Sequence, residues 1–152
     1  MTKHSIRLGV ALAAWLLAAA GIVFAGGTIT PAGDLKIPKQ EITATAKFYG
    51  YKAGNVYMEV LALRAPDGTV RTAFNTCQVC YDSGRGYYTQ EGEYLICNNC
   101  GNRFLARQVE LIKGGCNPVP ITKELKREDA EFIYIPKTVF EQARPLFLKW
   151  KK

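Results

Sequence analysis

Hydrophobic and polar residues alternate along much of the chain that follows an apolar N-terminal segment. Between residues 41 and 75, apolar side chains occupy every second position in two runs, namely Ile42, Ala44, Ala46 and Phe48, and then Val56, Met58, Val60 and Ala62. A period of two is that of a strand with one buried face. A turn at Pro66-Asp67-Gly68 separates the second run from residues 70–75. The pattern therefore predicts a β-meander with strands over residues 41–51, 55–64 and 70–75.

Two further segments predict strands. Residues 87–96 alternate around a turn at Glu91 and Gly92, which indicates a short hairpin. Residues 131–136 carry aromatic and β-branched side chains and predict a late strand. The chain is therefore expected to be mainly β.

Two segments favour helix. Leu105, Val109 and Ile112 have helical spacing, which favours a helix over residues 104–113, although an extended segment is the alternative. Thr138 and Glu141 match a capping box. A short C-terminal helix is expected to start there and to bend or end near Pro145.

The apolar N-terminal segment predicts the compartment. Residues 1–25 combine a short positive end with an uncharged apolar run, which is the pattern of an export signal. The run is also near the minimum length for a transmembrane helix, so we expect either a signal peptide or an N-terminal membrane anchor. Either one places the rest of the chain in the cell envelope, on the periplasmic or extracytoplasmic side. Residues 26–40 are rich in Gly and Pro and predict a linker with at most a short edge strand, which leaves residues 41–150 as one Cys-rich domain.

All five cysteines of the chain lie between residues 77 and 116. Two Cys-x-x-Cys pairs, Cys77 with Cys80 and Cys97 with Cys100, are separated by sixteen residues. At this spacing each pair forms a tight turn, or knuckle, and two knuckles bring four thiolates around one ion. The expected fold is α+β and mainly β, a small β-meander with a zinc-ribbon- or rubredoxin-like double-knuckle insertion and a C-terminal helix.

The spacing leaves the chemistry of these four cysteines open. Four thiolates bind Zn²⁺, a single iron or an iron–sulfur cluster. Two disulfide bonds that staple an exported fold, or a redox-active dithiol, are the alternatives to a metal. We favour metal binding, because each pair ends in a turn and Gly101 can adopt the positive φ that follows such a turn.

Cys116 stands alone between a glycine pair, Gly114 and Gly115, and the turn formers Asn117 and Pro118. The glycines permit a close approach of the backbone, and the Asn-Pro pair fixes a turn after the cysteine. Cys116 is expected to replace one of the four ligands, add a fifth, resolve a disulfide during metal release, or pair with another chain. A buried small apolar residue is the structural alternative.

Composition excludes several classes of function. The single histidine, His4, lies in the predicted export segment, so the domain has no imidazole for a Cys₂His₂ zinc site, for nucleophilic catalysis or for haem attachment. The formal net charge of +7 is dispersed rather than gathered in a basic stripe, so no nucleic-acid partner is expected. No general acid–base pair stands out, which disfavours a hydrolase or transferase.

The residues around the second pair and Cys116 resemble a known family. The matching residues are Gly86, Tyr87, Gln90, Gly92, Cys97, Cys100, Gly101, Phe104, Gly114, Gly115, Cys116, Asn117 and Pro118. They resemble the FtrD-like membrane iron–sulfur family, which is found with bacterial iron-uptake systems. The resemblance implies a redox module of the cell envelope, with Tyr87, Gln90, Gly101 and the residues around Cys116 supporting a metal site.

The resemblance also implies a cofactor and partners. It suggests iron or an iron–sulfur cluster bound by Cys77, Cys80, Cys97, Cys100 and Cys116, with zinc the main alternative. Because the N-terminal segment lacks a twin-arginine pair, the chain is expected to cross the membrane unfolded and acquire its metal outside, which favours a single ion. Expected partners are the membrane, an Ftr-type iron permease and associated periplasmic metal or redox proteins. A non-redox zinc-ribbon module and a periplasmic thiol–disulfide exchange protein are the alternative functions.

Overall fold

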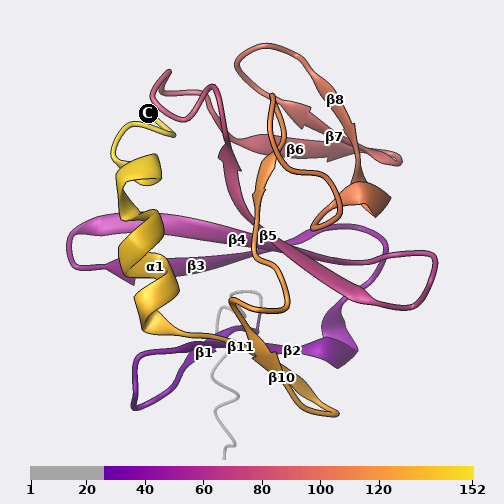
Figure 1. Cartoon of the computed structure of the whole chain (residues 1–152), viewed down its shortest axis with the longest axis vertical. Helices are drawn as coiled ribbons and strands as arrows, with labels where there is room; N and C mark the ends of the chain where they lie inside the picture. Colours follow the sequence, from indigo (N-terminus) through magenta and orange to yellow (C-terminus); the bar gives the residue numbers. More distant parts are fainter. Residues whose placement is uncertain (1–25) are drawn as a thin grey trace, which may run out of the picture.

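Three antiparallel sheets and one short α-helix form the part of the chain that the computed structural model describes, residues 26–152 (Figure 1). The signal peptide or anchor expected over residues 1–25 lies outside the described residues. The described part is mainly β, as predicted. Within it, no helix has the length and apolar character needed to span a bilayer.

The central sheet contains the predicted meander, but its first strand begins at Lys47 rather than at residue 41. The core-facing side chains of this strand are Tyr49, Tyr51 and Ala53, whereas Ala44 of the predicted buried face is exposed. The sheet consists of β3 (Lys47–Ala53), β4 (Val56–Arg64), β5 (Val70–Cys77) and β9 (Pro118–Pro120), in that spatial order. Met58 and Val60 of β4 belong to the main hydrophobic core, whereas Leu61 and Leu63 on the opposite face belong to a second, smaller core that includes cysteines. The central strand β4 therefore separates the two cores.

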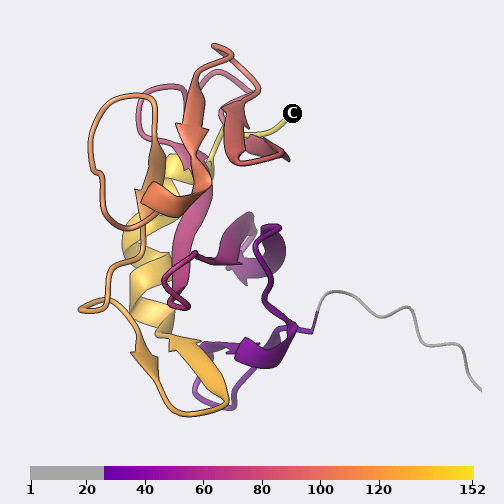
Figure 2. The ribbon, with the colours of Figure 1, turned by 90° about the vertical axis from the view of Figure 1, so that its right-hand side faces the viewer.

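The segment expected to be a linker is part of the fold. A second sheet contains, in spatial order, β1 (Thr28–Ile29), β2 (Leu35–Pro38), β11 (Phe132–Ile135) and β10 (Arg127–Glu128). The 3₁₀ helix η1 (Lys39–Glu41) follows β2 in the chain. This sheet lies at the lower end of the molecule in Figures 1 and 2. Leu35 and Ile37 are fully buried in the main core. The linker interpretation is wrong for these residues, whereas the late strand over residues 131–136 is confirmed.

The C-terminal helix forms, but its predicted cap is wrong. α1 (Lys137–Ala143) continues as the 3₁₀ helix η3 (Arg144–Phe147), which contains Pro145. The N-cap is Pro136 rather than Thr138, and the amide of Lys137 donates to Oδ1 of Asp34 over 3.2 Å. A carboxylate from the distant β1–β2 loop thus takes the place of the expected local cap.

Aromatic contacts attach the helix to the central sheet. The ring of Phe140 stacks on that of Tyr51 with centroids 3.6 Å apart, and Phe74 meets Phe140 edge to face. Phe147 and Trp150 continue this cluster with centroids 5.0 Å apart. The C-terminal aromatic residues therefore close the main core.

The third sheet contains the predicted hairpin. β6 (Tyr88–Glu91) and β7 (Tyr94–Cys97) pair across a turn with Gly92 at φ 57°, and β8 (Arg103–Leu105) pairs with β7. Figures 1 and 2 show this sheet at the upper end of the molecule, away from β2 and β11. The hairpin and its turn are therefore confirmed.

The helix favoured over residues 104–113 does not form. Phe104 pairs with Leu95 in the third sheet, and the short 3₁₀ helix η2 (Ala106–Gln108) follows. Glu110 has φ 68°, which no helical residue adopts. Its carboxylate accepts hydrogen bonds from the amide and hydroxyl of Thr72 at 2.6 and 2.9 Å and pairs with Lys126. These contacts with distant residues outweigh the helical spacing.

Replacement of Ile37 by alanine tests the place of β2 in the core. Ile37 is 0% exposed and pairs with Ile133, so Ile37→Ala should lower the free energy of unfolding by about 2–5 kcal/mol. Ile29→Ala makes the same change at a position that is 54% exposed and should cost less than about 0.5 kcal/mol. Urea unfolding of both variants measures the difference. Equal, small losses would contradict a buried β2.

Candidate metal centre

Two strand ends deliver the two Cys-x-x-Cys pairs. Cys77 is the last residue of β5, and Cys97 is the last residue of β7. In the first knuckle, the amide of Cys80 donates to Sγ of Cys77 over 3.3 Å. In the second, the amide of Gly101 donates to the carbonyl of Cys97 over 2.9 Å, and Gly101 has the expected positive φ of 73°. Each strand therefore fixes one sulfur, and the turn after it places the next.

Gly86 closes the first knuckle against the chain that leads into the hairpin. The amide of Cys77 donates to the Gly86 carbonyl over 2.8 Å. A Cβ on Gly86 would lie 2.2 Å from the carbonyl oxygen of Cys80, which is far inside van der Waals contact. Glycine is needed here because of this close approach of two backbones.

A third segment brings Cys116 to the knuckles. Gly114 and Gly115 have φ of 94° and 68°, and the amide of Gly114 donates to Oε1 of Gln78 over 3.1 Å. Pro118 pairs with Cys77 across the β5–β9 ladder. The expected close approach at the glycine pair is wrong, because a Cβ on either glycine would meet no atom within 4 Å. The glycines instead supply the positive φ of the loop, and Gln78 of the first knuckle holds it.

The five sulfurs converge. Those of Cys77, Cys80, Cys97 and Cys116 all lie within 4.8 Å of one another. Sγ of Cys116 is 3.3 Å from that of Cys77, 3.5 Å from that of Cys80 and 2.8 Å from that of Cys100. Cys100 is exposed and is not in the group of four. The compact group therefore contains Cys116 in the place where the spacing of the pairs put Cys100.

The donor set and its spacing fit a single metal ion. Four thiolates at about 2.3 Å from a tetrahedral ion lie about 3.8 Å from one another. The group of four is of this size, since its largest separation is within 4.8 Å. An iron–sulfur cluster places several metal and sulfide atoms between its ligand sulfurs, so it requires the thiolates to move apart. Four thiols at this spacing can bind iron or zinc with sulfur shifts of only about 1 Å.

The site gives its thiols unequal acidities. Burial raises the pKa of Cys97 to about 12 and also raises the pKa of Cys116. Burial disfavours the Cys77 thiolate too, but nearby backbone amides, among them that of Cys80, outweigh it and hold the pKa of Cys77 below its usual range. Its contact with Cys116 lowers the pKa of Cys100 to about 7. In the metal-free chain, negative charge is therefore favoured at Cys77 and at the exposed Cys100.

Two residues at the site are absent from the sequence prediction. The Tyr88 hydroxyl and Nδ2 of Asn102 each donate to the carbonyl of Cys116 over 2.9 Å. Tyr88 is fully buried and lies directly opposite Cys97 in the β6–β7 register. The hairpin pattern could have predicted Tyr88, because residues opposite each other in two paired strands lie on the same face of the sheet, and Tyr88 is opposite Cys97.

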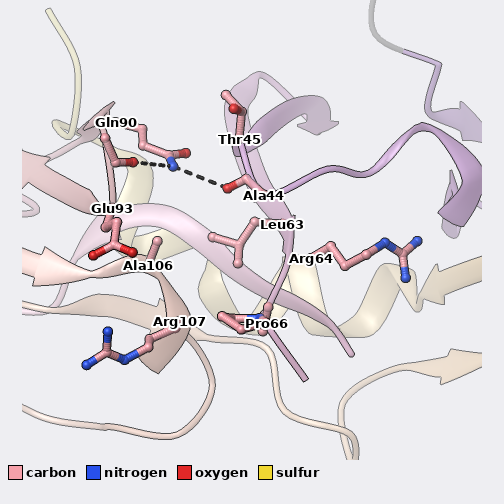
Figure 3. A pocket seen from close by; sticks show the side chains of 11 residues that line it. Ala44, Thr45, Leu63, Arg64, Pro66, Gln90, Glu93, Ala106 and Arg107 are labelled. Carbon is pink, nitrogen blue, oxygen red and sulfur yellow. Dashed lines mark hydrogen bonds between the residues drawn. The ribbon is translucent and has the colours of Figure 1, made fainter. Parts of the chain in front are cut away.

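Two of the expected supporting residues act through contacts other than with the sulfurs. The carbonyl of Tyr87 accepts from the amide and from Nδ2 of Asn98 in the second knuckle, both at 2.9 Å. The Tyr87 ring packs edge to face on Trp150, and Lys151 lies over it at 4.8 Å from the centroid. Gln90 joins the hairpin to the segment before β3. Its Oε1 accepts from the Ala46 amide at 2.6 Å. Its Nε2 donates to the Ala44 carbonyl at 3.2 Å, as Figure 3 shows. The pocket in Figure 3, about 160 Å³ in volume, has no cysteine in its lining. Gln90 therefore positions the hairpin and does not contact the cysteine sulfurs.

The acidities predict which thiol reacts first in the metal-free chain. At pH 8 a thiol with pKa about 7 is about nine-tenths thiolate, which is the reactive form, whereas a thiol with pKa about 12 stays protonated. Iodoacetamide should therefore modify Cys100 before Cys97 and Cys116, at a rate that rises with pH through about 7 and then levels off. Mass spectrometry after brief labelling measures the order. A fast phase that survives in Cys100→Ser would contradict the assignment.

Comparison with known protein families gives a match that covers the site. The model of a family described as membrane iron-sulfur containing protein FtrD-like matches residues 42–147, which include all five cysteines and more than half of the chain. No curated protein and no solved structure matches the chain. The family match confirms the resemblance found in the sequence, and the chain belongs to the FtrD-like family of membrane iron–sulfur containing proteins.

Proposed function

We propose that the chain is an exported metal-binding protein of the cell envelope that transfers electrons or handles metal in an iron-uptake system. The observation that supports this most is the compact group of four thiols, which come from three segments and lie within 4.8 Å of one another. Thiolates at this spacing are the ligands of a single soft or borderline metal ion. The proposed site differs from a rubredoxin or zinc-ribbon pair of knuckles, because Cys116 from a third segment takes the place of Cys100.

Each part of the site has a role in this proposal. Cys77, Cys80, Cys97 and Cys116 would hold the ion, and the burial of the first three keeps water from it. The Cys80 amide that points at the Cys77 sulfur stabilises the thiolate. Iron bound by thiolates supplies a one-electron couple whose potential depends on such hydrogen bonds and on burial. The chain itself fixes the sulfurs and shields three of the four from water.

Zinc is the main alternative metal, because it accepts the same four thiolates at nearly the same spacing. A zinc-bound chain would be a non-redox binding module, in which metal binding contributes folding free energy to the small second core. Cys77, Cys80 and Cys97 are themselves among the buried residues of this core, so a metal ion bound to them would contribute directly to its stability.

The compartment and partners in the proposal come from the sequence and the family. The family is described as one of membrane iron–sulfur containing proteins. Residues 1–25 have the pattern of an export signal or anchor. The partners we propose are an Ftr-type iron permease and periplasmic metal or redox proteins, which would exchange metal or electrons with the cysteine site.

Elemental analysis and visible absorption of the full chain, purified without oxygen from the envelope fraction, test the function. We expect about one iron per chain and a thiolate-to-iron absorption that bleaches with dithionite. A colourless protein with one zinc would reject the electron-transfer role. A metal-free protein whose thiol count rises on reduction would reject metal binding and select thiol–disulfide exchange.

Serine variants test which cysteines hold the ion. Cys97→Ser and Cys116→Ser should each reduce the bound metal at least tenfold, because each removes one of four ligands from the compact group. Cys100→Ser is the matched control, since it makes the same change in the second knuckle outside that group. It should keep the metal content of the wild type. Metal retained in Cys116→Ser but lost in Cys100→Ser would mean that the two pairs alone form the site.

A further inference from the structure

The sulfurs of the site differ sharply in their access to solvent. Cys77, Cys80 and Cys97 are buried, Cys116 is partly buried and Cys100 is exposed. A ligand in solution therefore reaches the centre from the side of Cys100 and Cys116. The sulfurs of these two residues are also the closest pair, at 2.8 Å.

The fold keeps this pair together through the backbone. Asn102, two residues after Cys100, donates from Nδ2 to the carbonyl of Cys116 over 2.9 Å. Tyr88 holds the same carbonyl from the buried side, also at 2.9 Å. Cys116 thus lies between the buried sulfurs and the exposed one, with its main chain fixed from both sides.

The other side of the Cys116 loop is open. A Cβ placed on Gly114 or Gly115 would meet no atom within 4 Å. Cys77 and Cys97, in contrast, are tied into strand ends by the pairs Cys77 with Pro118 and Cys97 with Tyr88. Strand pairing therefore fixes the positions of Cys77 and Cys97. The Cys100–Cys116 side has free space beside its loop, so a sulfur that binds the ion can be replaced by another on that side.

We propose that Cys100 is the exchange thiol through which a thiophilic divalent ion enters and leaves the centre, an inference that rests on the proposed metal-binding function. On exit, the Cys100 sulfur forms a bond to the ion as the bond from Cys116 breaks. The bonds from Cys77, Cys80 and Cys97, and last that from Cys100, are then exchanged for bonds from donor atoms of the acceptor chelator, and each of these sulfurs takes up a proton from water as it is released. The proton that Cys100 loses passes to water, and Cys116 takes up a proton from water once it is free. No electron is transferred, and entry follows the same steps in reverse.

This role differs from that of the four proposed ligands in its consequences. Removal of a ligand changes how much metal is bound, whereas removal of an exchange thiol changes how fast the ion moves. A neighbouring thiolate 2.8 Å from a ligand can enter the coordination sphere without diffusion. The acceptor for the ion is a soluble or protein-borne chelator that approaches the exposed Cys100.

Transfer of zinc to a chromophoric chelator tests the proposal. The full chain and Cys100→Ser are loaded with zinc, mixed with excess 4-(2-pyridylazo)resorcinol and followed by absorption. Cys100→Ser should bind the same amount of zinc and release it at least tenfold more slowly. In the zinc-loaded wild type, iodoacetamide should modify one thiol, and peptide mass spectrometry should identify it as Cys100.

The outcomes separate this proposal from the proposed function. Equal release rates in the two proteins would overturn the exchange role while leaving the metal site intact. Loss of zinc from Cys100→Ser, or protection of Cys100 from iodoacetamide in the loaded chain, would make Cys100 a permanent ligand and would also overturn it. A wild-type chain that binds no metal would reject the proposed function itself. The urea unfolding midpoint of Cys100→Ser checks that the variant is folded.

Discussion

The end of β5 is the point on which the candidate centre depends, because three segments of the chain must meet there. The amide of Cys77 bonds to the Gly86 carbonyl, Pro118 pairs with Cys77 across the ladder, and the Cys77 sulfur contacts that of Cys116. Sulfur atoms are thus part of the packing of the second core and not additions to its surface. A metal ion among them would join the same three segments, so fold and metal binding stabilise each other in this part of the molecule.

The main core makes this possible by supporting the sheet from the other face. Met58 and Val60 of β4 pack against the helix side, while Leu61 and Leu63 form the floor beneath the cysteine site. Glu110 and Lys126 join the chain before Cys116 to Thr72 of β5 through a largely buried ion pair. The turns that carry the cysteines therefore pack on a sheet whose position is fixed by the main core. This support allows short turns to hold four sulfurs close together.

Local patterns in the sequence predict much of this structure. The meander, the hairpin and the convergence of the cysteines follow from period-2 alternation, turn residues and Cys spacing, which are all encoded within short segments. The errors concern contacts between distant residues. β2 is four residues long and pairs with β11 from the other end of the chain, and Glu110 leaves the helical region because Thr72 and Lys126 hold it. The Cys-x-x-Cys spacing does not distinguish Cys97 from Cys100, whereas packing buries Cys97 and exposes Cys100. The motifs therefore could not predict that Cys116 is less exposed than Cys100.

The central claim is that Cys77, Cys80, Cys97 and Cys116 hold one ion. X-ray absorption spectroscopy at the metal edge of the purified chain measures it most directly, because it counts the ligand sulfurs and detects neighbouring metals. The account predicts four sulfurs at about 2.3 Å and no metal–metal scattering. Metal–metal scattering, or a shell with fewer than four sulfurs, would contradict it.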